Sequence, residues 1–259
     1  MWTDELHTAA QECWLETETG RYIFSRQEKL MMEMLSPVAG ERILDAACGT
    51  GNHLKLFERS RCSLTGMDAS GDALALARKK LGDACELVRG GGADFPFSDN
   101  EFDIVTLINA LRTRDDPHKT IAEALRVSRS RVFVGFMNKF SFAGTRSSLR
   151  RLFGLPASSS VRFFTIGEMR SIVARVMANS SVAWGSVVCL PGPFYTFFPQ
   201  CDEMLPVRRN PLGAFAGMLI TVRYTYRTAE NPLLNSFEMK TKGHAAPEAV
   251  RGMLQGRDR

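Results

Sequence analysis

The chain has 259 residues, of which 44% are hydrophobic and 24% are charged, and its formal net charge is +5. This composition fits a soluble enzyme with one large α/β domain and an elaboration, and the charge is far below that of a dedicated nucleic-acid-binding tract. No apolar stretch is long enough to span a membrane, and residues 1–5 are acidic where a secretory signal would be basic, so a cytoplasmic location is expected.

The six cysteines form no Cys-x-x-Cys pair, and together with the four scattered histidines they show no recognisable metal-ligand spacing. We therefore expect reduced thiols and no metal site. Cys48 is interpreted as a small buried apolar residue rather than a nucleophile, because free cysteine usually behaves in this way.

Residues 1–36 predict two helices, and the second has apolar side chains at helical spacing: Leu30, Met31, Met34 and Leu35. Between the helices, residues 14–22 read Trp-Leu-Glu-Thr-Glu-Thr-Gly-Arg-Tyr. The guanidinium of Arg21 could form paired hydrogen bonds with a carboxylate, and the ring of Trp14 or Tyr22 could lie against a cation. A packing tryptophan and a solvated arginine explain the same residues about as well.

Residues 43–52 read Ile-Leu-Asp-Ala-Ala-Cys-Gly-Thr-Gly-Asn, which predicts a buried strand that ends in an acid and a glycine turn that opens a helix. Glycine at 49 and 51 allows a tight turn and a close approach of the backbone to a ligand. The dinucleotide fingerprint requires a third glycine where this sequence has Leu54, and the P-loop requires a Gly-Lys-Ser/Thr run that this sequence lacks. NAD, FAD and P-loop nucleotides are therefore disfavoured.

This pattern resembles motif I of the class I S-adenosylmethionine-dependent methyltransferases. The chain looks most similar to the methyltransferase type 11 family, which includes enzymes of ubiquinone and menaquinone biosynthesis. The resemblance implies that Asp45, Ala47, Gly49 and Gly51 hold the centre of S-adenosylmethionine, the cofactor that becomes S-adenosylhomocysteine in the reaction. It also implies that the aromatic and basic side chains of residues 14–22 cover the methionine end of this cofactor.

A second acid, Asp68, ends the next predicted strand, residues 64–68, and lies 23 residues after Asp45. A carboxylate at about this spacing accepts two hydrogen bonds side by side from the hydroxyls of a ribose, so Asp68 is assigned to the ribose and Ala69 to the same pocket. Ser70 predicts the cap of the helix that follows.

A third element at residues 92–97 precedes the apolar strand 102–108. In the family that the chain resembles, the acid here binds the adenine amino group and its neighbour packs on the ring, which places Asp94 and Phe95 at the adenine. Each acid alone could equally be an ordinary strand-end residue, but three acids in order, each after a strand, favour a nucleotide pocket.

Asn109 follows the strand 102–108 and is assigned to the floor beneath the reactive methyl group. Asp116 and Pro117 predict the start of a helix that runs to Arg126, and residues 131–136 predict the next strand. This alternation predicts an α/β fold with a doubly wound, mostly parallel sheet, right-handed crossovers and helices on both faces.

The alternation breaks at residues 139–163, which are interpreted as a lid or substrate insertion. Thr165 and Glu168 then predict a capping box, and two β-rich runs at 182–190 and 214–226 predict the antiparallel pair that completes a seven-stranded, Rossmann-like sheet. The joint between these runs places Tyr195 among four aromatics between prolines. They suggest an apolar wall that faces the substrate, or equally a loop folded onto its own hydrophobic plug.

Five regions follow from this reading of the sequence. Residues 1–36 are cofactor-capping helices, residues 37–138 are the S-adenosylmethionine-binding core, and residues 139–163 are the lid insertion. Residues 164–227 supply a helix and the antiparallel pair, and residues 228–259 are expected to form a flexible tail.

Methyl transfer depends mostly on holding the acceptor in line within a dry pocket, so a catalytic base is optional. His118 is the candidate for a base and Tyr195 could donate to or orient an acceptor oxygen, whereas His53 is expected to face outward. Residues 109–112 lack the Asp/Asn-Pro-Pro-aromatic run that base-amino methyltransferases share, so DNA is not an expected partner.

By this elimination, the resemblance favours a small, partly apolar molecule as methyl acceptor. Two alternatives stay open. One is an RNA or protein methyltransferase whose Arg146, Arg150 and Arg151 bind phosphate or an acidic surface, and the other is a non-catalytic module that binds S-adenosylmethionine. The sequence predicts neither the methylated atom nor the oligomeric state.

Overall fold

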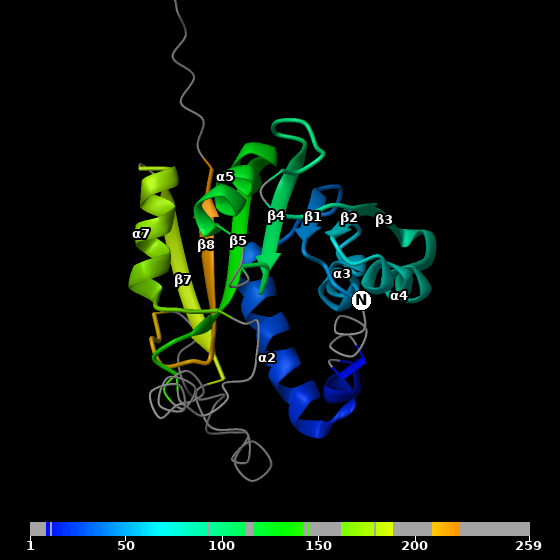
Figure 1. Cartoon of the computed structure of the whole chain (residues 1–259), viewed down its shortest axis with the longest axis horizontal. Helices are drawn as coiled ribbons and strands as arrows, with labels where there is room; N and C mark the ends of the chain where they lie inside the picture. The colour runs from blue at the N-terminus through cyan, green and yellow to red at the C-terminus, as the bar shows by residue number, and fades with distance from the viewer. Residues whose placement is uncertain are drawn as a thin grey trace, which may run out of the picture. The chain divides into compact units, whose positions relative to one another are not determined.

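The computed structural model describes residues 9–10, 12–92, 94–111, 116–141, 145, 162–178, 180–188 and 209–222, all within one compact unit, residues 1–223. Its centre is a sheet with the strand order β3-β2-β1-β4-β5-β8-β7 (Figure 1). The strands are β1 (Arg42–Ala46), β2 (Ser63–Asp68), β3 (Cys85–Arg89), β4 (Phe102–Ile108), β5 (Ser128–Asn138), β7 (Ser181–Val187) and β8 (Phe215–Thr221).

The first five strands are parallel to one another, and β8 runs antiparallel to both β5 and β7. The predicted mostly parallel sheet with a closing antiparallel pair is therefore confirmed. Among the described residues it has eight strands rather than the expected seven, because the two-residue strand β6 (Phe163–Phe164) pairs with the carboxyl end of β5. A two-residue strand is too short for its sequence alone to reveal it.

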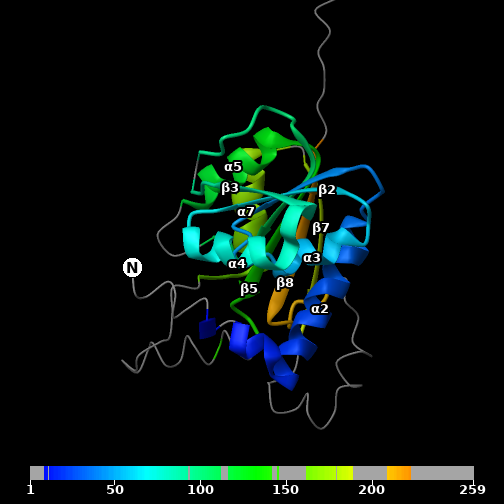
Figure 2. The same ribbon diagram turned by 90° about the vertical axis from the view of Figure 1, so that its right-hand side faces the viewer.

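Helices cover both faces of the sheet, as Figure 2 shows. They are α2 (Glu18–Leu35), α3 (Asn52–Glu58), α4 (Gly71–Leu81), α5 (Pro117–Val127) and α7 (Ile166–Val176), with a 3-10 turn, η1 (Gly82–Ala84). One apolar core joins α5 and α7 to the sheet through residues such as Ile121 and Met169. A second core, on the opposite face, contains Leu30 of α2 and Leu54 of α3.

Three helices begin where the sequence predicts. The Ser70 side chain accepts a hydrogen bond from the backbone N–H of Ala73 at the start of α4. Asp116 caps α5, whose first residue is Pro117. Thr165 and Glu168 form the expected reciprocal capping box of α7. These starts are legible in the sequence because each depends on residues at most three positions apart.

The third strand, β3, precedes the predicted element at residues 92–97. It ends before the glycines at 90–92 and pairs with β2 alone. As an edge strand with the exposed acid Glu86, it lacks the continuous apolar pattern of a central parallel strand.

β1 and β4 are neighbours in the sheet although β2 and β3 separate them in the chain. The strand order therefore reverses between β1 and β4. In open α/β sheets, such a switch point opens a crevice at the carboxyl ends of the strands, where ligands bind. Within the described part of the chain, no helix is both long and apolar enough to cross a lipid bilayer.

Candidate functional site

The glycine turn, residues 47–51, connects β1 to α3 at this switch point. Three of its residues have left-handed backbones, with φ of 75° at Ala47, 55° at Gly49 and 79° at Gly51. The backbone N–H groups of Ala47 and Cys48 both donate to the carbonyl oxygen of Met67, at 2.7 and 3.0 Å. The turn is thus fastened to the end of the neighbouring strand β2.

Asp68, at the end of β2, holds the same turn through its side chain. One carboxylate oxygen, Oδ2, accepts from the N–H of Gly49 at 2.9 Å, and the other, Oδ1, accepts from the N–H of Ser70 at 2.8 Å. Each carboxylate oxygen has two lone pairs, so each can accept one further hydrogen bond. Asp68 is 8% exposed and combines this bracing role with free acceptor capacity at the site.

Asp45, at the carboxyl end of β1, is completely buried. Its Oδ1 accepts from the Thr106 hydroxyl at 2.8 Å, while its Oδ2 is buried without a hydrogen-bond partner in the described structure. Burial, and to a lesser extent repulsion by Asp68, raise the pKa of Asp45 to about 7, although the Thr106 hydrogen bond opposes this. A buried carboxyl oxygen without a partner is costly, and such groups concentrate at functional sites.

The two glycines of the turn have different surroundings. A Cβ built on Gly49 would meet no atom within 4 Å, whereas one on Gly51 would lie 2.8 Å from Leu81 Cδ1 and 3.3 Å from Ala77 Cβ. Gly51 is therefore needed for packing of the turn on α4. The space above Gly49 is open, so a ligand can approach the backbone there.

A small cavity of about 30 Å³ lies at the switch point. It is lined by residues from strand ends, from the loops that follow strands, and from α5: Ala46, Ala47, Met67, Gly91, Gly92, Phe95, Leu107, Ala110 and Thr120. Its volume is far below the roughly 300–1,000 Å³ of a complete ligand pocket, so we interpret it as the floor of a larger site.

Phe95 is buried and lines this cavity, whereas Asp94 is exposed and does not line it. Gly91 and Gly92 line the cavity beside Phe95. A Cβ on Gly91 would lie 3.4 Å from the Cβ of Ala69, which is an ordinary van der Waals contact. The glycine pair directly after a strand was the sequence signal for these residues.

Two charged residues of α5 fix the loop that carries Phe95. Glu123 accepts a hydrogen bond from the N–H of Phe95 at 3.0 Å. Arg126 donates to the carbonyl oxygens of Phe95 and Phe97, at 3.0 and 2.9 Å, and forms an ion pair with Glu123 at 2.7 Å. The hydrogen bond from Arg126 lowers the pKa of Glu123 and keeps this carboxylate ionised.

The predicted covering segment, residues 14–22, forms the corner at the start of α2. Thr17 caps this helix by accepting from the N–H of Gly20, and its hydroxyl donates to the carbonyl oxygen of Trp14 at 2.7 Å. A Cβ on Gly20 would lie only 1.9 Å from that carbonyl oxygen. These contacts give Thr17 and Gly20 a structural role. Trp14 and Arg21 are exposed, and Tyr22 is half-buried.

The other candidates lie as follows. Asn109 is exposed directly after β4, with φ of 52°, and its N–H donates to the carbonyl oxygen of Gly135. His118 is half-buried on the first turn of α5. Tyr195 and the tail at 228–259 lie outside the described residues, and so do residues 142–144 and 146–161 of the lid insertion predicted at 139–163.

His53 does not face outward as expected. Its ring lies 5.0 Å from that of Phe24 on α2, and its Nε2 is buried without a partner in the described structure. Burial lowers the pKa of His53 to about 4, so the imidazole is neutral at physiological pH. The sequence could not predict this position, because the contact with Phe24 comes from α2, which lies far from His53 in the chain.

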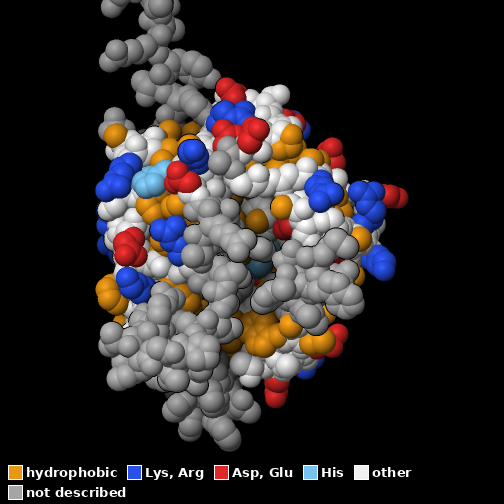
Figure 3. Space-filling model, in the orientation of Figure 1, with side chains coloured by type: hydrophobic (Ala, Val, Ile, Leu, Met, Phe, Trp, Pro, Cys, Tyr) orange, Lys and Arg blue, Asp and Glu red, His pale blue; other side chains and the backbone are white. Residues whose placement is uncertain are grey.

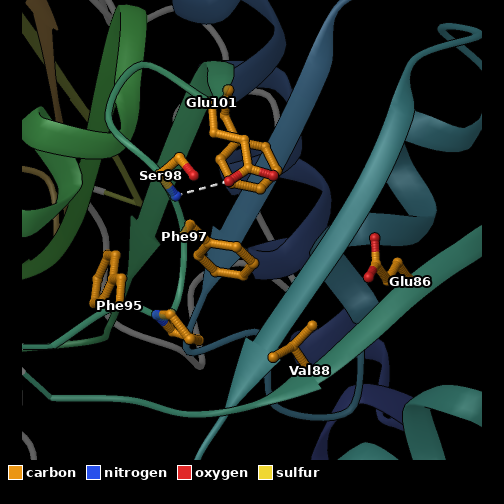
Figure 4. A pocket seen from close by; sticks show the side chains of 8 residues that line it. Glu86, Val88, Phe95, Phe97, Ser98 and Glu101 are labelled. Atoms are coloured by element: carbon orange, nitrogen blue, oxygen red, sulfur yellow. Dashed lines mark hydrogen bonds between the residues drawn. The ribbon is translucent and has the colours of Figure 1, made fainter.

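A larger hollow of about 480 Å³ lies on the other side of Phe95, between β3 and the loop before β4. Figure 4 shows Glu86 and Val88 on one side of it and Phe97, Ser98 and Glu101 on the other. The N–H of Ser98 donates to Glu101 at 2.8 Å. This hollow is open, and Phe102, the first residue of β4, forms part of its lining. It therefore faces away from the carboxyl ends of the strands, where ligands bind.

Residues 44–134 match a family model described as "Methyltransferase domain". Among curated proteins, the chain is 40% identical over 95 residues to a demethylmenaquinone methyltransferase of Clavibacter sepedonicus, covering 36% of this chain and 39% of that protein. It is 32% identical over 109 residues to a ubiquinone/menaquinone biosynthesis C-methyltransferase of Roseobacter denitrificans, covering 39% and 44%. The chain therefore spans less than half the length of these relatives.

Solved structures show the same fold. The S-adenosylmethionine-dependent methyltransferase of Thermotoga maritima superposes with a TM-score of 0.64 at 18% identity, covering 82% of this chain and 94% of that one. The [4+2]-cyclase SpnF superposes with a TM-score of 0.54 at 17% identity, covering 76% and 80%. The expected fold is thus confirmed, and a cyclase on the same fold shows that the fold alone does not determine the reaction.

Proposed function

We propose that this chain, which carries a class I S-adenosylmethionine-dependent methyltransferase domain, transfers the methyl group of that cofactor to a small, partly apolar molecule. The observation that carries the proposal is the glycine turn, where Asp68 braces Gly49 from beneath and the space above Gly49 is open. The names of the matched relatives support a quinone-type ring as the acceptor class.

The residues at the turn suit this cofactor in charge and in shape. Asp68 can accept hydrogen bonds from ribose hydroxyls in addition to the two backbone N–H groups that it already binds. Asp45 and Asp68 lie close enough to repel each other, and the carboxylate of Asp68 favours a cationic ligand. Phe95 and the glycines at 91 and 92 offer an apolar floor without side chains that would obstruct a flat ring.

When bound, S-adenosylmethionine supplies a methyl group activated by a positively charged sulfur. The residues of this chain would bind and orient the cofactor and exclude water, and such positioning can supply most of the rate enhancement in a displacement reaction. We assign cofactor binding to Asp45, Ala47, Gly49, Gly51 and Asp68, with Phe95 at the adenine. Asn109 and His118 stay candidates for the acceptor side of the site.

The rival acceptors find less support in the described residues. The arginines at 146, 150 and 151, on which an RNA or protein substrate would depend, lie outside those residues. On the face seen in Figure 3, the visible Lys and Arg side chains alternate with Asp and Glu. A nucleic-acid surface would instead gather basic side chains in one patch.

A transfer assay with methyl-labelled S-adenosylmethionine tests the proposal. Demethylmenaquinone, total RNA and a protein extract would be offered separately, and Asp68→Asn would serve as the matched inactive control. We expect label in the organic-extractable product. Label in RNA or protein would instead assign the other acceptor class, and binding of cofactor without any transfer would favour the non-catalytic module.

A further inference from the structure

Four polar side chains from three distant segments meet at the outer side of the glycine turn: Glu12, Thr50, Asn52 and Lys80. Glu12 comes from the helical residues before α2, Thr50 lies between the two glycines of the turn, and Lys80 lies near the end of α4. We call this group the Glu12–Lys80 clamp. None of these residues was a candidate from the sequence.

Short hydrogen bonds join the four side chains of the clamp to one another. Glu12 Oε2 lies 2.6 Å from Lys80 Nζ, and Glu12 Oε1 accepts from the Thr50 hydroxyl at 2.5 Å and from Asn52 Nδ2 at 3.0 Å. Lys80 Nζ also donates to Asn52 Oδ1 at 2.8 Å and to the Thr50 hydroxyl at 3.2 Å. All three donor positions of Lys80 Nζ and both carboxylate oxygens of Glu12 are therefore used within the group.

The clamp is shielded from water more than an ordinary surface ion pair. The side chains of Lys80 and Glu12 are 26% and 29% exposed, and Thr50 is 4% exposed. Burial alone would raise the pKa of Glu12, but hydrogen bonds from Lys80, Thr50 and Asn52 hold it below its usual value. Hydrogen bonds to charged groups in such surroundings are stronger than those of exposed pairs.

The position of Thr50 connects the clamp to the cofactor. Thr50 lies between Gly49 and Gly51, whose left-handed backbones give the turn its shape. Asp68 binds the turn through the N–H of Gly49, and Glu12 binds it through the hydroxyl of Thr50. The glycines are free to adopt other conformations, so these two anchors, together with the hydrogen bonds of Ala47 and Cys48 to Met67, restrict the turn to one of them.

We propose that Glu12 and Lys80 are positioning residues that fasten the N-terminal helical segment to the glycine turn and hold it in the shape that binds S-adenosylmethionine. This inference rests on the proposed function for the identity of the ligand. The segment at 12–35 thus affects cofactor affinity through Thr50, and Glu12 itself does not contact the cofactor.

Three variants test the clamp. Lys80→Met keeps the aliphatic stem but removes the charge, and Lys79→Met is the matched control on the neighbouring, exposed lysine. The double variant Glu12→Lys with Lys80→Glu reverses the ion pair, and the Thr50 hydroxyl and Asn52 amide can serve either arrangement because each can donate and accept.

Calorimetric titration with S-adenosylhomocysteine would be combined with amide hydrogen exchange of residues 49–52 in the cofactor-free protein. We expect Lys80→Met, which removes the three hydrogen bonds donated by Lys80 Nζ, to weaken binding about tenfold and to speed exchange in the turn. The control should change neither quantity, and the reversed pair should restore most of both.

Unchanged affinity in Lys80→Met, or a fall in melting temperature alone, would overturn the proposal and leave the clamp with a structural role only. If the unmodified protein bound no S-adenosylhomocysteine, the proposed function would fail. The exchange measurement would still decide whether the clamp holds the turn, and equal exchange in Lys80→Met and the unmodified protein would then refute it.

Discussion

The N–H of Gly49 and the carboxylate of Asp68 are joined by a hydrogen bond of 2.9 Å. This contact links the glycine turn after β1 with the acid at the end of β2, two features that the sequence presents separately. Both oxygens of Asp68 bind backbone N–H groups, so Asp68 is at once a brace of the turn and a candidate ligand for a ribose.

Substitution Asp68→Asn should therefore affect both binding and stability. An amide has one acceptor oxygen, so it can keep one of the two backbone hydrogen bonds and loses the negative charge. We expect affinity for S-adenosylmethionine to fall at least tenfold and unfolding free energy to fall by about 1–2 kcal/mol. Calorimetry and urea unfolding measure these quantities. The control Asp83→Asn, on the exposed turn η1, should alter neither; full affinity in Asp68→Asn would contradict the assignment.

The two glycines of the turn should respond differently to alanine. Gly51→Ala places a methyl group 2.8 Å from Leu81 and keeps a left-handed backbone, so we expect a stability loss of about 2–4 kcal/mol. Gly49→Ala meets open space and should cost only about 1 kcal/mol, yet its methyl group would occupy the approach to the turn.

Parallel thermal unfolding and cofactor titration would separate these effects. Binding should be lost in Gly49→Ala while most of its stability stays. Normal binding by Gly49→Ala would show that no ligand uses the space above this residue.

Asp45 predicts a pH dependence of stability. The pKa of Asp45 is raised from 3.8 to about 7 by burial, so between these values the folded protein holds a proton that the unfolded chain releases. The contribution of Asp45 to the free energy of unfolding is complete below pH 4. As the pH rises from there through 7, this contribution is lost at about 1.4 kcal/mol per pH unit. Urea unfolding of Asp45→Asn at several pH values should lack this loss. Equal pH slopes for the variant and the unmodified protein would refute the assignment.

His53 should contribute the opposite slope. The pKa of His53 is lowered from 6.5 to about 4, so the unfolded chain binds a proton in this range that the folded protein excludes. Its contribution is complete above pH 6.5 and is lost as the pH falls through 4. In the unmodified protein this slope offsets that of Asp45, and His53→Gln should expose the Asp45 slope. Unchanged pH dependence in His53→Gln would show that this imidazole titrates normally when folded.

The sequence predicts those parts of the structure that depend on neighbouring residues. The caps at Ser70, Asp116 and Thr165 and the glycine turn each lie within a few residues of what they organise. The parallel sheet follows from the repeated alternation of strand and helix. These features are local, so they can be read from the pattern alone.

The parts that could not be predicted depend on residues far apart in the chain. Glu12 and Lys80 are 68 positions apart, and neither carries a local signal for the ion pair that joins them. His53 precedes the core residue Leu54, so helical periodicity directs it outward, but Phe24 of α2 covers it. Asp94 satisfies the order of acids but is exposed, and the cavity is lined instead by Gly91 and Gly92.

The central claim is that the glycine turn binds S-adenosylmethionine. Calorimetric titration of the purified protein with S-adenosylmethionine and S-adenosylhomocysteine, with NAD as control, tests it most directly. The account predicts binding of both sulfur compounds in the micromolar range, about −8 kcal/mol, and no binding of NAD. Binding of NAD, or of neither sulfur compound, would contradict it.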